Sequence, residues 1–309
     1  MKLLKSYCFL FLMGCCFCAC TDTVSSDEAI GVDGIAGFQA GKVSGKPSPV
    51  TPNSSSTILN GSSSSSGTVK SSTSKSKSKD YDWSLTKSAY LNPDIEYGEM
   101  TDERDGKKYK TVQIGEQTWM AENLNYADSN LTPSIKGKSW CVDNDESKCD
   151  IVGRFYTWTA AIDSVALAND EDNPRTCGHG APCELSGDKI RGICPEGWHV
   201  PSSNEWTDLN AAVGGEGIAG KLLKSKKGWQ GSHTGTDEYG FSAIPAGFPR
   251  PEKNASNWDL GDRTFFACIC GGESEDYVRN EAFVKEDDDG YLASNTKWNA
   301  VSVRCIKDL

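Results

Sequence analysis

A serine-rich stretch divides the chain and decides which part of it can fold. Between Gly41 and Asp80, 15 of 40 residues are Ser and none is aromatic. A segment of this composition has too little apolar surface to offset the backbone entropy that folding would cost. We therefore expect a disordered Ser- and Lys-rich tether, with a root-mean-square reach of about 35 Å over its length. Any hydrophobic core must come from the residues that follow it.

The first 20 residues have the pattern of an export signal. Two Lys precede an apolar run over residues 7–19, which is shorter than the roughly 20 residues that a membrane-spanning helix needs. Cys15 and Cys20 each follow a small residue, and both positions resemble the lipobox of bacterial lipoproteins, in which the Cys receives the lipid. We expect lipidation at Cys20, with Cys15 as the alternative. A plain secretory signal is the competing interpretation.

These features predict three parts: a lipoprotein signal peptide over residues 1–20, a tether over 21–90 and a folded domain over 91–309. The whole chain carries a formal charge of −11, of which residues 1–90 contribute +3, so the predicted domain carries −14. Binding to nucleic acid depends on positive charge that neutralises phosphates. We therefore expect no nucleic-acid partner.

Periodic apolar residues predict three helices in the domain. Positions three and four residues apart indicate a helix over 157–168. Ser202 and Glu205 have the spacing of a capping box and predict the start of a second helix, which ends at the glycines 214–215. A short third helix is expected over 218–224.

Segments in which apolar and polar residues alternate, or which are rich in β-branched residues, predict strands near the start and near the end of the domain. The expected strands are residues 108–114, 118–120, 264–269, 282–285 and 300–306. Asp289-Gly290 is typical of a hairpin turn. In the last strand, Val301, Val303 and Cys305 alternate with polar residues, which predicts a half-buried strand. Helices in the middle and antiparallel strands at the end indicate an α+β fold.

Several motifs, in this order, resemble the Fibrobacter succinogenes major paralogous (FISUMP) domain. They are TDERDGKKYKTV (residues 101–112), IGEQTWMAENLN (114–125), GRFYTW (153–158), CPEGWHVP (194–201), GFSA (240–243) and SVRC (302–305). The resemblance covers residues 101–309. It implies a bacterial envelope domain, often lipid-anchored and without an established reaction, at the outer membrane or surface of a Gram-negative cell. It also implies a distant likeness to the C-type-lectin-like fold of formylglycine-generating enzymes.

Eight of the 13 Cys lie in the predicted domain. An even number of Cys in an exported protein favours disulfide bonds. Local pairing is expected for Cys141 with Cys149, which bracket an acidic loop, and for Cys177 with Cys183. The resemblance to C-type-lectin-like folds adds a long-range bridge between Cys194 and Cys305.

Cys268 and Cys270 then remain. Alternate residues of a strand point to opposite faces, so a direct bridge between the two would be strained. We favour two ordinary half-cystines in a different connectivity over a thiol site at this position.

Three Trp in loop-like segments are candidates for ligand binding. The rings of Trp229, Trp258 and Trp298 could stack on sugar faces if exposed, or fill the core if buried. The acidic runs 143–146 and 286–289 offer oxygen ligands for Ca²⁺, but neither matches an EF-hand. We expect no cofactor, with Ca²⁺ as the exception considered.

Together these features predict a lipid-anchored envelope protein that acts by binding rather than by catalysis. The expected partners are the membrane, through the anchor, and a polysaccharide or a surface protein. One alternative is an oxidase-like enzyme of the formylglycine-generating type that uses domain Cys. The other is a structural component of the envelope.

Overall fold

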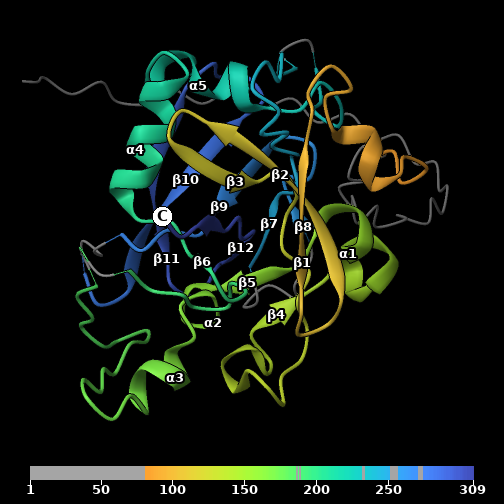
Figure 1. Ribbon diagram of the computed structural model, residues 1–309. Helices are drawn as coiled ribbons and strands as arrows, with labels where there is room; N and C mark the ends of the chain where they lie inside the picture. Colours follow the sequence, from red (N-terminus) through yellow and green to blue (C-terminus); the bar gives the residue numbers. More distant parts are fainter. Residues whose placement is uncertain (1–80, 186, 188, 232–233, 251–256, 271–273) are drawn as a thin grey trace, which may run out of the picture. The chain divides into compact units, whose positions relative to one another are not determined.

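The computed structural model describes residues 81–309 except 186, 188, 232–233, 251–256 and 271–273 (Figure 1). The predicted signal peptide, both lipidation candidates and most of the predicted tether lie outside the described residues. Residues 81–90, which we assigned to the tether, contain the 3-10 helix η1 (Lys87–Tyr90). Tyr81 and Tyr90 are buried in a cluster with Phe155 and Ile244. The folded unit therefore includes this segment.

A five-stranded antiparallel sheet holds residues from both ends of the folded unit. Its order is β1 (Gly98–Asp102), β2 (Lys107–Ile114), β3 (Gln117–Met120), β13 (Ile306–Lys307) and β6 (Trp198–His199). The strand β13 lies between β3 and β6, because Ile306 pairs with Trp119 on one side and His199 on the other. The last strand of the chain is thus an internal strand of this sheet.

The described residues also form three smaller antiparallel sheets. They are β11 (Gly290–Thr296), β10 (Tyr277–Val284) and β9 (Arg263–Phe266); β12 (Ala300–Val301), β5 (Phe155–Thr157) and β4 (Ser139–Trp140); and β7 (Phe248–Pro249) with β8 (Asn257–Trp258). The β10–β11 hairpin turns just before Gly290, where the Asp-Gly pair predicts it. Strand β9 ends at Phe266, three residues before the expected end.

The helices are short, and α4 and α5 lie beside β10 and β11 (Figure 1). The helices are α1 (Glu146–Val152), α2 (Trp158–Ala161), α3 (Ser164–Ala168), α4 (Ser203–Ala212) and α5 (Glu216–Leu223), with 3-10 turns η2 (Pro133–Ile135) and η3 (Val142–Asn144). The capping box at Ser202 and Glu205 is confirmed. The single helix expected over 157–168 is wrong, because Asp163 adopts φ 52° and separates α2 from α3. Short helices and antiparallel sheets confirm the α+β class.

An aromatic core lies between the central sheet, α4 and the β9–β11 sheet. Trp119 of β3 packs against Trp206 of α4, with ring centroids 4.7 Å apart. Phe241, Phe266 and Phe283 continue the cluster, with centroid separations of 5.7 to 6.4 Å from their ring neighbours. Burial of such rings supplies most of the driving force for folding.

The segment expected as one half-buried terminal strand is different in the structure. It splits into β12 and β13, and the polar side chains of Ser302 and Arg304 are as buried as the apolar ones, at 0% and 1% exposure. The prediction of a solvent-facing side is therefore wrong. The backbone of this segment is hydrogen-bonded on both edges, to Phe265 and Ala267 through Ser302 and to Leu124 and Met120 through Val303 and Cys305, so it runs through the interior rather than along the surface.

Arg304 is a buried cation whose three guanidinium nitrogens each donate inside the protein. Its guanidinium donates to the side-chain oxygen of Asn123 at 2.7 Å and to the carbonyls of Met120 at 3.1 Å and Ser242 at 3.0 Å, and also to the Phe241 carbonyl. Burial lowers the pKa of Arg304 to about 9, so the side chain stays charged at neutral pH. The guanidinium lies 4.7 Å from the Phe241 ring centroid.

The eight domain Cys form four disulfide bonds. The pairs are Cys141–Cys149, Cys177–Cys183, Cys194–Cys305 and Cys268–Cys270. We expected a direct bridge between Cys268 and Cys270 to be strained because a strand was predicted to run through both residues. Because β9 ends at Phe266, the backbone at this pair need not alternate, and the two Cα atoms lie 5.1 Å apart.

The long-range disulfide should stabilise the fold more than the local ones, because it closes a much longer loop. Replacing Cys194 and Cys305 by Ala opens a link across 111 residues, and the entropy of loop closure predicts a loss of about 4 to 5 kcal/mol. The matched variant with Cys177 and Cys183 replaced opens a link across only 6 residues and should lose about 2 kcal/mol. Urea denaturation of both variants measures the difference. Equal losses would contradict an entropic role for the long bridge.

Glu281 of β10 is a buried acid in an apolar setting. One carboxyl oxygen accepts a hydrogen bond from Asn210 at 3.0 Å, and the other has no hydrogen-bond partner among the described residues. Burial raises the pKa of Glu281 from 4.5 to about 8. Between these values the folded protein keeps a proton that the unfolded chain has released. Rising pH therefore destabilises the fold, by up to about 1.4 kcal/mol per pH unit.

We predict that Glu281→Gln removes this pH dependence, because the amide keeps an acceptor for Asn210 and cannot ionise. Relative to the variant, the unaltered protein should lose about 3 kcal/mol of stability between pH 5 and pH 8. Denaturant midpoints over this pH range measure the effect. The exposed Glu103→Gln change is the control. Parallel pH profiles for the unaltered protein and Glu281→Gln would show that Glu281 is ionised in the fold.

Candidate functional site

One of the three predicted binding aromatics is an exposed ring. Trp298 is 46% exposed, in the turn between β11 and β12. Trp229 is 5% exposed and its indole N–H donates to the Ala243 carbonyl at 3.1 Å, so of the two roles considered for this ring it has the one in the core. Trp258 lies in β8, but its side chain is not among those described. Trp298 is therefore the exposed aromatic residue of the candidate binding site.

The turn that carries Trp298 is fixed by its buried neighbour Lys297. The ammonium of Lys297 donates to the carbonyls of Gly178 at 3.0 Å and Ala181 at 3.1 Å, and lies 4.9 Å from the Trp158 ring centroid. Its backbone N–H donates to the carbonyl of Asp276 at 2.9 Å. Burial lowers the pKa of Lys297. Because Lys297 points inward, the adjacent Trp298 side chain points to the surface.

His179 lies against the exposed indole. The ring centroids of His179 and Trp298 are 4.7 Å apart at an interplanar angle of 38°. His179 is in the loop closed by the Cys177–Cys183 disulfide, in which Gly178 and Ala181 form a β-bridge. This disulfide therefore sets the position of the imidazole next to the indole.

Asp276 completes the group by holding the loop from the other side. Its Oδ1 atom lies 3.0 Å from Nε2 of His179 and accepts a hydrogen bond from the Gly180 N–H at 3.1 Å. Three segments distant in sequence thus bring together an aromatic face, an imidazole and a carboxylate. We call Trp298, His179 and Asp276 the Trp298 platform. An exposed ring with adjacent hydrogen-bonding groups can hold the apolar face and the hydroxyls of a sugar.

We predict that Lys297→Met loosens this platform. The change keeps a long apolar stem and removes the donor to the two loop carbonyls, which should cost about 1 to 3 kcal/mol. Hydrogen exchange should become faster in residues 177–183 and stay unchanged in β2 and β3. The exposed Lys227→Met variant is the control. Unchanged exchange in the loop would contradict the role given to Lys297.

Cys268 and Cys270, for which we favoured bonds to other Cys over a thiol site, are bonded to each other in this structure. They are 0% and 3% exposed, and Cys305 is bonded to Cys194 and is also buried. An oxidase of the formylglycine-generating type would need one of these sulfurs as an accessible thiol. None of the three is accessible in the part of the chain that the structure describes.

The two acidic runs considered for Ca²⁺ have structural contacts. In the first, Asp143 pairs with Lys148, and Asp145 accepts from the Ser147 N–H at 3.0 Å as the cap of α1. In the second, the Asp287 carbonyl accepts from the buried ammonium of Lys224 at 2.7 Å. Both runs thus have a role in the fold, and the expectation of no cofactor, with Ca²⁺ as the exception considered, stays a prediction.

His199 is a buried residue that lies between two carboxylates. Its Nδ1 atom lies 2.7 Å from Asp308 and its Nε2 atom 2.7 Å from Glu205. A carboxylate only accepts hydrogen bonds, so both contacts are hydrogen bonds when both ring nitrogens carry a proton. Burial opposes ionisation of Glu205, but hydrogen bonds from His199 and Ser202 outweigh it and lower the pKa of Glu205. The imidazole joins β6 to the start of α4 and to the residue after β13.

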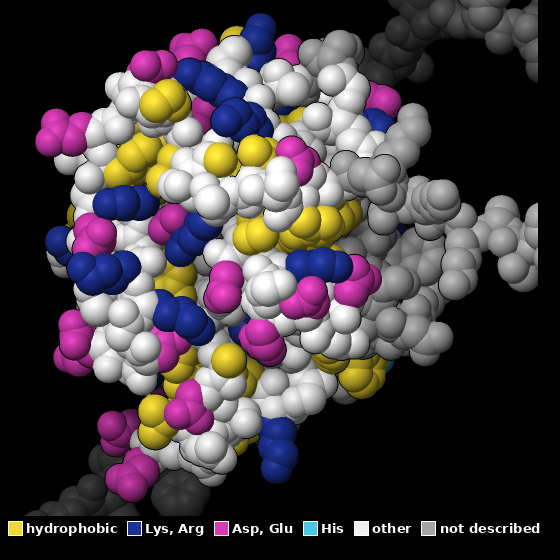
Figure 2. Space-filling model, turned by 90° about the vertical axis from the view of Figure 1, so that its right-hand side faces the viewer, with side chains coloured by type: hydrophobic (Ala, Val, Ile, Leu, Met, Phe, Trp, Pro, Cys, Tyr) yellow, Lys and Arg dark blue, Asp and Glu magenta, His cyan; other side chains and the backbone are white. Residues whose placement is uncertain are grey.

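Charge on the surface is mixed where Figure 2 shows it. Lys and Arg side chains alternate with Asp and Glu, and hydrophobic side chains lie between them. The described residues on this face form no extended region of one sign. Recognition by charge alone is therefore not favoured on this face.

The fold and the site define a disulfide-bonded α+β domain with a preorganised aromatic surface. The family model described as the Fibrobacter succinogenes major domain matches residues 112–307, and the chain belongs to this family. Neither the characterised proteins nor the solved structures compared with the chain give a match. Among the described residues, no helix has the length and apolar character to cross a bilayer.

Proposed function

We propose that this chain is a lipid-anchored protein of the bacterial cell envelope that displays a binding domain on a Ser-rich tether. The anchor is Cys20, with Cys15 as the alternative, and the site of display is the outer membrane or the cell surface. The ligand is a polysaccharide or a surface protein. Membership of the family and the four disulfides support an envelope domain.

The single observation that carries a polysaccharide ligand is the exposed Trp298 ring held in place by buried contacts. An indole 46% exposed can cover the C–H face of a pyranose ring. Within the described part of the chain, the contacts of Asp276 to His179 and Gly180 both use Oδ1, which leaves its second carboxyl oxygen for a sugar hydroxyl. The disulfide and the Lys297 contacts order these groups before binding, which lowers the entropy cost of association.

The C-type-lectin-like fold is part of the same proposal. A long-range bridge between a central segment and the last strand is what that resemblance implies, and Cys194–Cys305 has this placement. The enzymatic alternative has less support, because its candidate sulfurs are buried in disulfides. A structural role in the envelope is the outcome favoured if no ligand binds.

Sedimentation with insoluble polysaccharides tests the function. We expect the full-length chain to bind at least one member of a panel of glucans, xylans and chitin. Trp298→Ala should bind it about tenfold more weakly, as expected for the loss of one aromatic contact of about 1.4 kcal/mol.

Tyr291→Ala is the matched control, because Tyr291 is also an exposed ring, 36% accessible, but lies at the other end of β11. Its binding should equal that of the unaltered chain. Equal binding by Trp298→Ala would remove the Trp298 platform from the proposal. Absence of binding to every polysaccharide would favour a surface-protein ligand or a structural role.

A further inference from the structure

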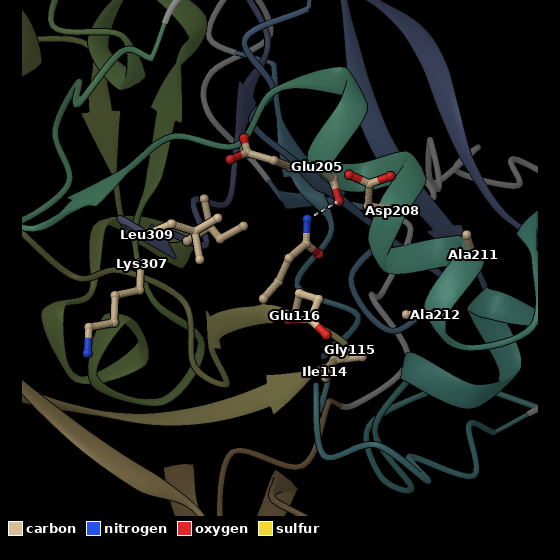
Figure 3. A pocket seen from close by; sticks show the side chains of 11 residues that line it. Ile114, Gly115, Glu116, Glu205, Asp208, Ala211, Ala212, Lys307 and Leu309 are labelled. Carbon is tan, nitrogen blue, oxygen red and sulfur yellow. Dashed lines mark hydrogen bonds between the residues drawn. The ribbon is translucent and has the colours of Figure 1, made fainter.

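A cleft separate from the Trp298 platform lies where the β2–β3 turn meets α4 and the residues after β13 (Figure 3). Its volume is about 410 Å³, which falls within the range of roughly 300 to 1,000 Å³ found for ligand sites. The Trp298 platform and this cleft share no residue. A ligand of this cleft would therefore bind independently of the proposed polysaccharide.

The floor of the cleft is apolar and is open because its residues are small. Gly115 in the turn and Ala211 and Ala212 at the end of α4 line it, with Ile114 and Ile306 beneath. Gly115 has φ 59°, and a Cβ atom there would lie 3.1 Å from that of Ala212. A larger residue at position 115 would thus fill part of the space. The floor suits an aliphatic chain.

One wall of the cleft is held by hydrogen bonds. The side-chain amide of Gln117 donates to the Glu205 carbonyl at 3.0 Å (dashed in Figure 3) and its oxygen accepts from the Trp119 indole at 3.0 Å. The carboxylate of Glu205 contacts His199 and accepts from the Ser202 N–H at 2.8 Å. Both oxygens of Glu205 therefore have partners inside the protein.

Two other carboxylates of the cleft are available. Glu116 and Asp208 are exposed, and neither has a hydrogen bond or an ion pair within the described part of the chain. Lys307 also lines the cleft, but Figure 3 shows its side chain directed away from Asp208. The rim on the side of the turn and α4 is therefore anionic.

We propose that this cleft binds a lysine or arginine side chain presented by a protein partner. Such a side chain has an aliphatic stem, which matches the floor of small apolar residues, and a terminal cation, which matches Glu116 and Asp208. A free metal ion would leave the apolar floor unused, and an anionic ligand would meet two carboxylates. The charge of −14 on residues 91–309 also attracts a basic partner over a longer range.

Saturation-transfer difference NMR on the full-length chain tests this site with Nα-acetyl-lysine methylamide as the probe. We expect the strongest transfer to the side-chain methylene protons, because the stem lies on the apolar floor. The norleucine analogue, which has no charge, and the Nε-acetyl analogue should each bind at least fivefold more weakly. Higher salt should weaken binding of the lysine probe only, because the carboxylates are exposed.

The double variant Glu116→Gln with Asp208→Asn should bind the lysine and norleucine probes equally. Glu103→Gln, an exposed acid outside the cleft, is the control and should keep the preference for lysine. Ala211→Phe, which fills the cleft, should abolish binding of every probe, and thermal melting shows whether each variant is folded.

Three results would overturn the proposal. The first is equal binding of lysine and norleucine by the unaltered chain. The second is a preference for lysine that survives in the folded double variant. The third is a dimer, seen by sedimentation, that dissociates on Ala211→Phe while no probe binds, since the occupant would then be a second copy of the chain. Loss of polysaccharide binding in Trp298→Ala has no bearing on these outcomes.

Discussion

A single buried guanidinium holds together segments that lie far apart in the sequence. Arg304 donates to oxygens of Met120, the last residue of β3, and of Asn123 just after it. It also donates to the carbonyls of Phe241 and Ser242, in the loop before β7. A buried charge is tolerated only when its donors are satisfied, so these oxygens must stay within hydrogen-bonding distance of one another. The loops that supply them therefore cannot move independently, and Cys305, next in the chain, is bonded to Cys194.

The loop before β7 also connects the first residues of the folded unit to the surroundings of Arg304. Asp237 accepts hydrogen bonds from the N–H and hydroxyl of Ser242, both at 2.7 Å, and burial raises the pKa of Asp237 to about 7. The Asp237 carbonyl accepts from Asn92, and Tyr97 contacts the Ser242 hydroxyl at 3.0 Å. Residues close to the start of the described chain are thus tied to the residues around Arg304.

Local sequence rules predicted local structure and missed contacts that depend on the whole fold. The capping box at Ser202 was predictable because its partners are three residues apart. The break at Asp163 was not, since a left-handed residue is invisible to apolar periodicity. The burial of Arg304 contradicted the alternation rule because packing on both faces outweighs strand pattern.

In the candidate sites too, single residues could be predicted from the sequence but contacts between distant residues could not. Trp298 could be singled out from the sequence, but only the fold shows that it is exposed while Trp229 is buried. His179 and Asp276 are 97 residues apart and meet through a disulfide loop, and no pattern in the sequence indicates that contact. The cleft was missed for the same reason, because its walls come from the β2–β3 turn, α4 and β13.

The position of β13 inside the central sheet has a consequence for the order of folding. Strands β3 and β6 are joined through Ile306, so the sheet remains in two parts until residues 306–307 have been synthesised. The contacts of Arg304 and the bridge to Cys194 have the same requirement. Pairing across such long sequence separations forms slowly. A nascent chain with this arrangement therefore stays incompletely folded until residues 304–307 have been synthesised, whatever has already formed around β2 and β3.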